Sequence, residues 1–335
     1  MNSRAKTYPD PMLSIVIPVH NEAEVIPTLL NRLTQVTRTL DGPVELLFVD
    51  DGSRDNSVAL LLQARRRHPG IRVLQLSRNF GKEAAVSAGL QHARGEAVIL
   101  MDADLQDPPE RIPDMLAAWR KGADVVLMKR RTRAGESWLK RLTAHLFYRL
   151  INRISDAPIP VDTGDFRLMS RRTVDALNRL PERNRYLKGM FAWVGMPTVT
   201  LEFDRDPRLA GRTKWNYLKL MHLAMEGITS FSTRPLRLAL VLGLLAAGTG
   251  GLFGVWEVLK ALIFGIDTPG YASMIAMITF LSGVQLLCLG LLGEYVGRIY
   301  METKQRPVFI VAEDSDDSAH RPLPQLRVAG HDPDH

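Results

Sequence analysis

Two carboxylates, Asp102 and Asp104, stand one residue apart at the end of the apolar run AVILM, which begins at Ala97. The run has the length and composition of a buried strand, so both side chains are expected where that strand emerges into a loop. Neighbouring carboxylates there repel each other and lose solvation, and a hard divalent cation shared with a phosphate would relieve both penalties. An ordinary solvated acidic loop is the alternative, and the pair alone does not exclude it.

Apolar runs of strand character alternate with helical patterns through residues 13–128. The expected strands span about residues 13–19, 44–49, 71–76, 97–101 and 124–128. The expected helices span about residues 24–38, 56–68, 82–93 and 110–121. This alternation favours a doubly wound α/β fold, in which helices cover both faces of a mostly parallel sheet.

Polar residues follow four of these strands at their carboxyl ends, where open parallel sheets bind ligands. They are residues 20–22, 50–51, 78–82 and 102–106, and we expect one crevice to collect them. No G-x-G-x-x-G follows a strand and no G-x-x-x-x-G-K-[ST] occurs, because Glu83 follows Lys82. These absences disfavour a dinucleotide dehydrogenase and a P-loop NTPase.

The length of 335 residues exceeds the usual single domain, so two or more units are expected. A net charge of +7 suits phosphorylated ligands, an anionic membrane surface or nucleic acid. The single cysteine, Cys288, excludes an intramolecular disulfide and a Cys-based zinc cluster. The first 12 residues contain no apolar export segment, so we expect the α/β domain to remain cytoplasmic.

Two long apolar segments, residues 236–264 and 272–296, each cover the roughly 20 residues needed to span a bilayer. Their connection, residues 265–271, carries no Lys or Arg, and the basic residues lie at the opposite ends: Arg234, Arg237, Arg298, Lys304 and Arg306. The positive-inside rule therefore places both termini in the cytoplasm. We expect a transmembrane region at 234–300 and a tail at 301–335, disordered from about residue 312.

A basic segment between Lys129 and Arg153 precedes the apolar segments. Its apolar residues at 138, 142, 146 and 150 lie on one helix face and leave a largely basic remainder. Such a helix would lie in the headgroup plane of an anionic membrane, although an ordinary surface helix has the same pattern. Gly250 with Gly254 and Gly293 with Gly297 give small-residue spacings that suggest a homo-oligomer.

Several motifs resemble a known family. IVIPVHNE, VDDGSRDNS and DADLQDPP resemble the family 2 glycosyltransferases of the GT-A fold. The chain to about residue 311 resembles the polyprenyl-phosphate glycosyltransferases, relatives of dolichol-phosphate mannose synthase. It is most similar to bacterial bactoprenol glucosyltransferases through SRNFGKE, GDFRLMSR, PERN, LKGMFAWVG, EGITSFST and LLGEYVGRIYMETKQRP. The Q-x-x-R-W motif of processive polysaccharide synthases is absent.

The resemblance implies a Rossmann-like GT-A catalytic domain followed by two C-terminal transmembrane helices. Residues 1–130 would form the nucleotide-sugar-binding core, and residues 131–233 the acceptor side with its membrane-surface helices. It also implies roles for residues that match the family motifs. The implied ligands of Mg²⁺ or Mn²⁺ are Asp102, Asp104 and Gln106. The implied donor-binding residues are Pro18, His20, Glu22 and Asp51, with Arg208, Gly211, Thr213 and Lys214 on a loop that closes over the diphosphate.

On the acceptor side, Arg130 and Arg141 match arginines that hold the acceptor phosphate. Asp165 matches a carboxylate near the sugar, and with Asp102 and Asp104 it completes the implied catalytic residues. We assign Asp165 to substrate orientation or weak base help. Without the resemblance, Arg208 and Lys214 would be solvated loop charges, and Asp165 a loop carboxylate paired with Arg167.

The implied activity is metal-dependent, inverting transfer of a sugar from a UDP-sugar, with UDP-glucose favoured, to undecaprenyl phosphate. A lipid monophosphate is largely an anion at neutral pH, so the reaction needs positioning and leaving-group stabilisation more than a strong base. The expected location is the bacterial inner membrane, with a flippase as a further partner and no nucleic acid. Alternatives are a mannose, N-acetylhexosamine or aminoarabinose donor, a processive or protein-directed glycosyltransferase, and a non-catalytic membrane scaffold.

Overall fold

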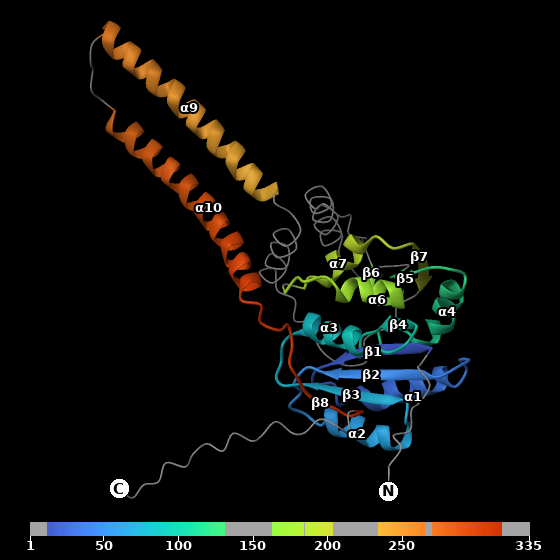
Figure 1. Ribbon diagram of the computed structural model, residues 1–335. Coiled ribbons are helices and arrows are strands. Elements are labelled where there is room, and N and C mark those ends of the chain that lie inside the picture. Colours follow the sequence, from blue (N-terminus) through green and yellow to red (C-terminus); the bar gives the residue numbers. More distant parts are fainter. Residues whose placement is uncertain (1–11, 131–162, 184, 204–233, 265–269, 317–335) are drawn as a thin grey trace, which may run out of the picture.

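The computed structural model describes residues 12–130, 163–183, 185–203, 234–264 and 270–316. Within these residues an eight-stranded sheet has the order β7-β5-β6-β4-β1-β2-β3-β8 (Figure 1). The strands are β1 (Leu13–Val19), β2 (Val44–Asp50), β3 (Ile71–Leu76), β4 (Ala97–Leu100), β5 (Val125–Arg130), β6 (Thr163–Ser170), β7 (Thr198–Phe203) and β8 (Val311–Asp314).

The centre of the sheet is parallel. Strand β1 pairs with both β2 and β4, and β2 pairs with β3, all in parallel register. Every residue of β1 is buried, as expected for a strand whose two faces are both covered by helices. The five strands expected from the sequence are confirmed, and the carboxyl ends of β1 to β4 meet at one edge of the sheet.

Strand β6 is inserted between β4 and β5 and runs antiparallel to both. Because β4 and β5 are each antiparallel to β6, they are parallel to each other and end at the same edge. The register aligns Leu100 with Arg167, which brings Asp165 near the start of the acidic loop after β4. Strands β6 and β7 were not among the expected elements, and β6 makes the sheet mixed.

Helices cover both faces of the sheet. One face carries α1 (Ile26–Thr37), α2 (Ser57–Arg67) and α4 (Ile112–Arg120), which follows the short 3-10 helix η1 (Pro109–Arg111). The other face carries α3 (Lys82–His92), α6 (Arg171–Asn178) and α7 (Leu187–Val194). An apolar core lies on each face of the sheet, and alternate residues of β1 pack into the two cores. Ile15 and Ile17 pack into the core under the first group of helices, and Val16 packs into the core under the second. The site therefore rests on a scaffold that is packed from both sides.

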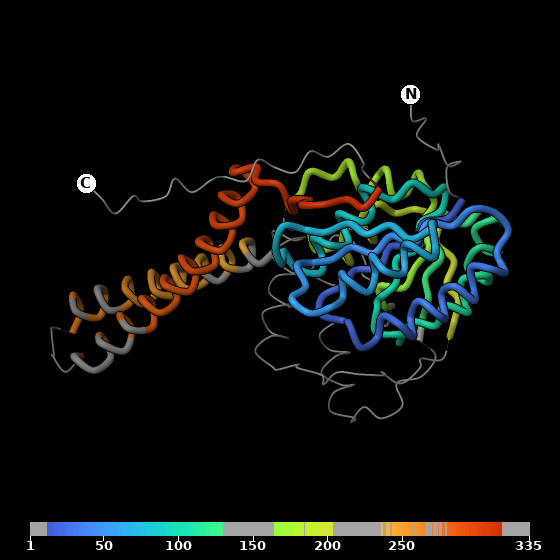
Figure 2. The backbone as a smooth tube through the Cα atoms, turned by 90° about the horizontal axis from the view of Figure 1, so that it is seen from below, coloured from blue at the N-terminus to red at the C-terminus, as the bar shows by residue number. Residues whose placement is uncertain are grey.

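Two long helices, α9 (Arg234–Phe264) and α10 (Tyr271–Thr303), project together from one side of the α/β domain (Figures 1 and 2). Ala239–Trp256 and Phe280–Thr303 are long and apolar enough to cross a membrane, a criterion that uses length and composition alone. Large apolar side chains of these two helices are exposed, for example Leu252 at 75% and Leu262 at 78%, both in α9. Such surface is rarely left in water by a soluble protein.

After α10 the chain returns to the domain as β8, which pairs antiparallel with β3. The buried Arg72 guanidinium donates to Asp314 and to Glu45, with nitrogen–oxygen distances of 2.5 and 3.1 Å. Ser315 adds a bond from its backbone N–H to the Val73 carbonyl, at 2.9 Å. The expected disorder from about residue 312 is therefore wrong for residues 312–316. Polar composition suggested a solvated tail, whereas these polar groups pair with a buried arginine and a strand edge.

Candidate active site

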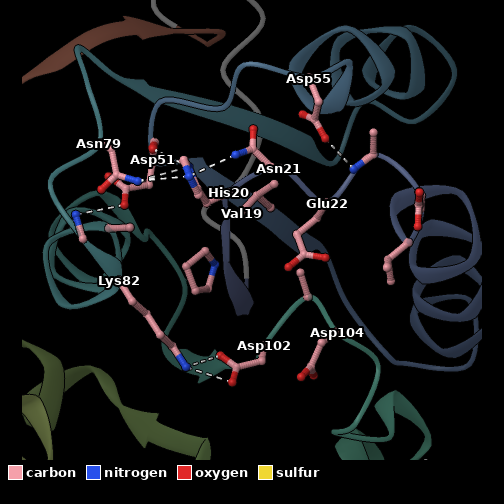
Figure 3. A pocket seen from close by; sticks show the side chains of 17 residues that line it. Val19, His20, Asn21, Glu22, Asp51, Asp55, Asn79, Lys82, Asp102 and Asp104 are labelled. Atoms are coloured by element: carbon pink, nitrogen blue, oxygen red, sulfur yellow. Dashed lines mark hydrogen bonds and ion pairs between the residues drawn. The ribbon is translucent and has the colours of Figure 1, made fainter. Parts of the chain in front are cut away.

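A cavity of about 600 Å³ opens at the carboxyl ends of β1, β2 and β4 (Figure 3). The crevice expected from the sequence is therefore present. It brings together six of the residues singled out above: Pro18, His20, Glu22, Asp51, Asp102 and Asp104. Asn79 and Lys82, from the polar stretch 78–82 that was expected there, also line it, together with Asp55. The parallel strands carry their polar loops to one place, as expected for an open α/β sheet.

Asp51 connects two of the loops that form the cavity. Its buried carboxylate accepts hydrogen bonds from the backbone N–H groups of Phe80 and Gly81, at 2.7 and 2.9 Å. The adjacent Gly52 has a φ of +68°, and a Cβ there would lie 2.6 Å from the backbone nitrogen of Asn79. The Asp51–Gly52 turn can thus approach the β3–α3 loop only because residue 52 has no side chain.

His20 lies on the same side of the cavity. Its Nδ1 is 2.9 Å from the carbonyl oxygen of Asp51, and its Nε2 is 3.1 Å from the side-chain nitrogen of Asn79. Asn21, with a φ of +56°, accepts a 2.8 Å hydrogen bond from the backbone N–H of Arg54. These contacts hold three loops together, so this wall is organised before any ligand binds.

The acidic loop after β4 forms the opposite wall. Asp102 and Asp104 face the cavity (Figure 3), and Asp104 Oδ1 accepts the backbone N–H of Gln106 at 3.1 Å. Gln106 lies outside the set of residues that line the cavity. A magnesium or manganese site commonly combines one or two carboxylates with substrate phosphates, and these two carboxylates fit that arrangement. Among the described residues, no group of three or more His, Cys, Asp or Glu is arranged to hold a metal ion.

Lys82, from the first turn of α3, bridges two carboxylates, one from the acidic loop after β4 and one from strand β6. Its Nζ lies 2.6 Å from Asp102 Oδ1 and 2.6 Å from Asp165 Oδ2. Burial alone would lower the pKa of Lys82, but the charges of Asp102 and Asp165 raise it above its ordinary value. The ammonium is therefore charged at neutral pH. The sequence signal was a lone lysine in SRNFGKE, at the carboxyl end of β3 and among acidic loops.

Asp165 lies in strand β6 and not in a loop. Burial alone would raise its pKa, but the charges of Lys82 and Lys188 hold the pKa of Asp165 below its ordinary value. Its carboxylate pairs with Lys82, and not with Arg167 as in the alternative reading of a loop carboxylate. Arg167 instead donates to the carbonyl of Gly164 at 3.1 Å and stacks on Phe191, with Cζ 3.8 Å from the ring centroid.

Two further ionisable groups, Arg167 and Glu83, interact with the pair formed by Lys82 and Asp165. Burial lowers the pKa of Arg167 to about 10, which still leaves the guanidinium charged at neutral pH. Glu83 follows Lys82 in α3 and is partly exposed. Two effects raise the pKa of Glu83 to about 7: first the desolvation of its carboxylate by surrounding protein atoms, and then the charge of Asp165. Neither environment could be predicted from the sequence, because both depend on the position of β6.

Among the described residues, Arg130 is a predicted site residue that does not line the cavity. Arg130 is the last residue of β5, and because β5 runs parallel to β4, it ends at the same edge as Asp102. Arg141, Arg208, Gly211, Thr213 and Lys214 lie outside the described residues, as does the predicted amphipathic helix. Their roles stay predictions.

Comparison with known proteins identifies related chains. Residues 14–177 match the family model described as glycosyl transferase family 2, and residues 234–299 match the one described as the GtrB C-terminal hairpin. An uncharacterized glycosyltransferase of Synechocystis sp. is 47% identical over 301 residues, covering 90% of this chain and 95% of that protein. The bactoprenol glucosyl transferase of Shigella phage SfV is 46% identical over 302 residues, covering 90% and 98%. The prophage bactoprenol glucosyl transferase homolog of Escherichia coli K12 is 46% identical over 299 residues, covering 89% and 98%.

This similarity extends through the cavity loops, the inserted strand β6 and the apolar hairpin. The expected α/β architecture of GT-A type, followed by two long apolar helices, is confirmed. With 47% identity over nine-tenths of its length, and a matching family model across the cavity, the chain belongs to the family 2 glycosyltransferases.

Proposed function

We propose that this glycosyltransferase transfers glucose from UDP-glucose to a polyprenyl phosphate at the cytoplasmic face of a bacterial membrane. The observation that carries the proposal is the combination, in one chain, of the acidic cavity with the α9–α10 hairpin, at 46% identity to bactoprenol glucosyl transferases. A soluble acceptor would not require an apolar hairpin attached to the catalytic domain. A phosphorylated lipid is available only at a membrane surface.

The cavity supplies a place for the nucleotide. Pro18, His20, Glu22 and Asp51 line the part formed by β1 and β2, where the nucleoside would bind. Asp102 and Asp104 would hold the divalent cation, Mg²⁺ or Mn²⁺, with Gln106 as the further predicted ligand beside them. When bound, that ion would neutralise charge on the nucleoside diphosphate as it departs.

The reaction itself is a displacement at the anomeric carbon of the sugar. An oxygen of the acceptor phosphate forms the new bond to that carbon, while the bond to the diphosphate oxygen breaks and its electron pair leaves with UDP. Attack opposite the departing group inverts the anomeric centre. Because the acceptor is already an anion, the protein needs to position it and to exclude water more than to remove a proton.

Asp165 and Arg130 are the residues proposed for the acceptor side. Asp165 is held in β6 with its carboxylate toward Lys82, so it is suited to orient a sugar hydroxyl. Arg130 ends β5 at the edge where the cavity opens, and a guanidinium offers paired donors to a phosphate. Arg141 would assist it, and Arg208 and Lys214 would close over the diphosphate.

The hairpin is proposed to cross the membrane twice, with the catalytic domain and both termini in the cytoplasm. We propose two further partners: a second copy of the chain, in a homo-oligomer, and a flippase that moves the product across the membrane. The product would be a lipid-phosphate-linked sugar that serves as donor for a cell-envelope glycan.

The test is a transfer assay with the full chain purified in detergent. Undecaprenyl phosphate would be incubated with Mn²⁺ and a panel of nucleotide sugars: UDP-glucose, UDP-N-acetylglucosamine, GDP-mannose and a UDP-aminoarabinose. We expect a lipid-phosphate-hexose from UDP-glucose with the highest kcat/KM. A higher kcat/KM with another donor would overturn the choice of sugar, and a growing polymer or a glycosylated protein would overturn the choice of acceptor.

A further inference from the structure

The ion pairs of Lys82 place a cation where the two halves of the proposed reaction meet. Asp102 belongs to the proposed metal and diphosphate side, and Asp165 to the sugar and acceptor side. The Lys82 ammonium lies 2.6 Å from an oxygen of each. Among the described side chains that line the cavity, Lys82 is the sole lysine or arginine.

The two partners of Lys82 differ in how firmly they are held. Asp165 is part of β6, and the neighbouring Arg167 is buried, bonded to backbone carbonyls and stacked on Phe191. Asp102 lies in the acidic loop, two residues after β4 ends at Leu100. Lys82 itself is a long, unbranched side chain that retains 46% of its exposed surface, so its ammonium can move while its backbone stays in α3.

A divalent cation and the Lys82 ammonium compete for the same carboxylate. Once a metal ion binds Asp102, the ammonium loses that partner and faces a like charge at short range. The repulsion between the two cations favours movement of the ammonium away from the metal ion. An ammonium has three N–H donors, so Lys82 can keep Asp165 and still donate to another anion. The anions brought to this position by the proposed reaction are phosphates.

We propose that Lys82 exchanges Asp102 for a phosphate oxygen at the reacting centre when substrates bind, while it keeps its ion pair with Asp165. Before substrates bind, Lys82 holds the two carboxylates together and limits their repulsion. In the loaded site it serves as a phosphate-binding residue. This inference rests on the proposed function and deepens it. The phosphate belongs either to the nucleotide diphosphate or to the acceptor monophosphate, and the two sources can be separated experimentally.

The first measurement is Mn²⁺ binding to the full chain without nucleotide. Lys82→Met removes the competing cation, so we expect Mn²⁺ to bind on the order of tenfold more tightly than to the unmodified chain. Lys188→Met is the matched control, because Lys188 acts on Asp165 and Glu83 through its charge. It should change Mn²⁺ affinity less than threefold. Equal tightening in both variants would mean that only the general charge of the site matters, and would overturn the exchange.

The second measurement is the affinity for UDP in the presence of Mn²⁺, together with the KM values for both substrates. Lys82→Met should lower kcat/KM for transfer about a hundredfold, and Lys82→Arg should restore part of that loss because it keeps the cation. Weaker UDP binding and a raised KM for UDP-glucose would assign the diphosphate. Unchanged UDP binding with a raised KM for polyprenyl phosphate would assign the acceptor. Unchanged kcat/KM for both substrates would overturn the inference.

Failure of the proposed function can be distinguished from failure of this inference. If the unmodified chain does not glycosylate polyprenyl phosphate, the proposed acceptor is wrong, yet the Mn²⁺ and UDP measurements still test the exchange. Lys82→Gln provides a second uncharged variant with a polar side chain in case Lys82→Met does not fold. Thermal unfolding in detergent identifies which variants are folded and can be compared.

Discussion

The aspartates of the cavity have different partners, and the partners indicate different roles. Asp51 uses both carboxylate oxygens on backbone N–H groups of the β3–α3 loop, so its main effect is to hold that loop. Asp102 pairs with the ammonium of Lys82, and Asp104 faces the cavity beside it. Asp102 and Asp104 are therefore the carboxylates best placed to receive a cation.

Asp104→Asn should lower transfer by two orders of magnitude or more while the chain stays folded. The substitution removes a charged oxygen ligand but keeps the side chain's shape and its bond to the N–H of Gln106. The measurement is kcat/KM at saturating Mn²⁺, with thermal unfolding as the check on folding. Excess chelator should abolish transfer by the unmodified chain, and added Mg²⁺ or Mn²⁺ should restore it.

The control for that variant is Asp114→Asn. Asp114 is an exposed carboxylate of α4 that pairs with Arg111 at 3.1 Å, away from the cavity. It should leave kcat/KM within about twofold of the unmodified value, as is usual for a surface position. Full activity of either chain in excess chelator would contradict the metal assignment.

Arg130→Ala should reduce transfer to polyprenyl phosphate more than it reduces hydrolysis of UDP-glucose by water. Arg130 ends β5 at the cavity edge, and only the transfer reaction requires the acceptor phosphate to be bound. Arg130→Lys should also be impaired, since a lysine does not reproduce the planar pair of donors. Both rates would be measured for each variant.

Lys129→Ala provides the comparison. Lys129 is an exposed basic residue that precedes Arg130 in β5. It should affect both reactions little. Equal losses of transfer and hydrolysis in Arg130→Ala would show that Arg130 serves the donor or the fold.

Most of the cavity could be predicted from the sequence, because its residues follow strands with clear apolar patterns. Asp102, Asp104, His20 and Glu22 all come directly after such runs. The pairing of Lys82 with Asp165 could not be predicted in the same way. The two residues are separated by 83 positions, and they meet only because β6 inserts antiparallel beside β4. Local patterns carry no information about that insertion.

At the scale of elements, two of the three strands that the sequence analysis missed, β7 and β8, lie at the edges of the sheet. Strand β7 is at one edge with an exposed face, and β8 has four residues, two of them exposed. Short edge strands lack the continuous apolar run that marks a buried strand. Their formation depends on partners already in place, as Arg72 shows by pairing with Asp314.

Asp314→Asn should destabilise the α/β domain, and the loss should depend on pH. Burial alone would raise the pKa of Asp314, but hydrogen bonds from Arg72 hold it below its ordinary value. A carboxyl with a lowered folded-state pKa contributes stability above its unfolded pKa of about 4, and that contribution disappears as the pH falls through the folded pKa. The difference in the free energy of unfolding between the unmodified chain and the variant should therefore be largest near pH 7 and should become small below pH 4.

Thermal unfolding of the full chain in detergent between pH 3 and pH 7 measures this gap. Removing one partner of a buried ion pair costs about 3 kcal/mol, which sets the expected size near neutral pH. Glu313→Gln is the control on the same strand, where the carboxylate accepts an exposed bond from Gln75. A gap of constant size across the pH range would show that Asp314 does not act through its charge.

At the scale of the whole molecule, the apolar hairpin is joined to the catalytic domain at several points. Glu302, near the end of α10, accepts the backbone N–H of Arg183 at 2.9 Å, and Arg183 Nη1 donates to the carbonyl of Arg306 at 2.7 Å. The next residues form β8 on the opposite edge of the sheet from β7. The hairpin therefore continues into a strand of the catalytic sheet, which connects the cavity to the two long apolar helices.

This connection makes the orientation of the hairpin decisive for the proposed function, which requires the domain to face the compartment that contains UDP-sugars. Basic residues flank the domain end of both helices, and residues 265–271 contain none, so we predict that this connection faces away from the cytoplasm. In a Cys288→Ser background, Gly270→Cys should react with a membrane-impermeant maleimide in intact cells. Glu313→Cys, exposed in β8, should react only after the membrane is permeabilised. Labelling of Glu313→Cys in intact cells would place the cavity on the outer face of the membrane, away from a cytoplasmic donor. Protection of both positions in intact cells would mean that the hairpin does not cross the bilayer.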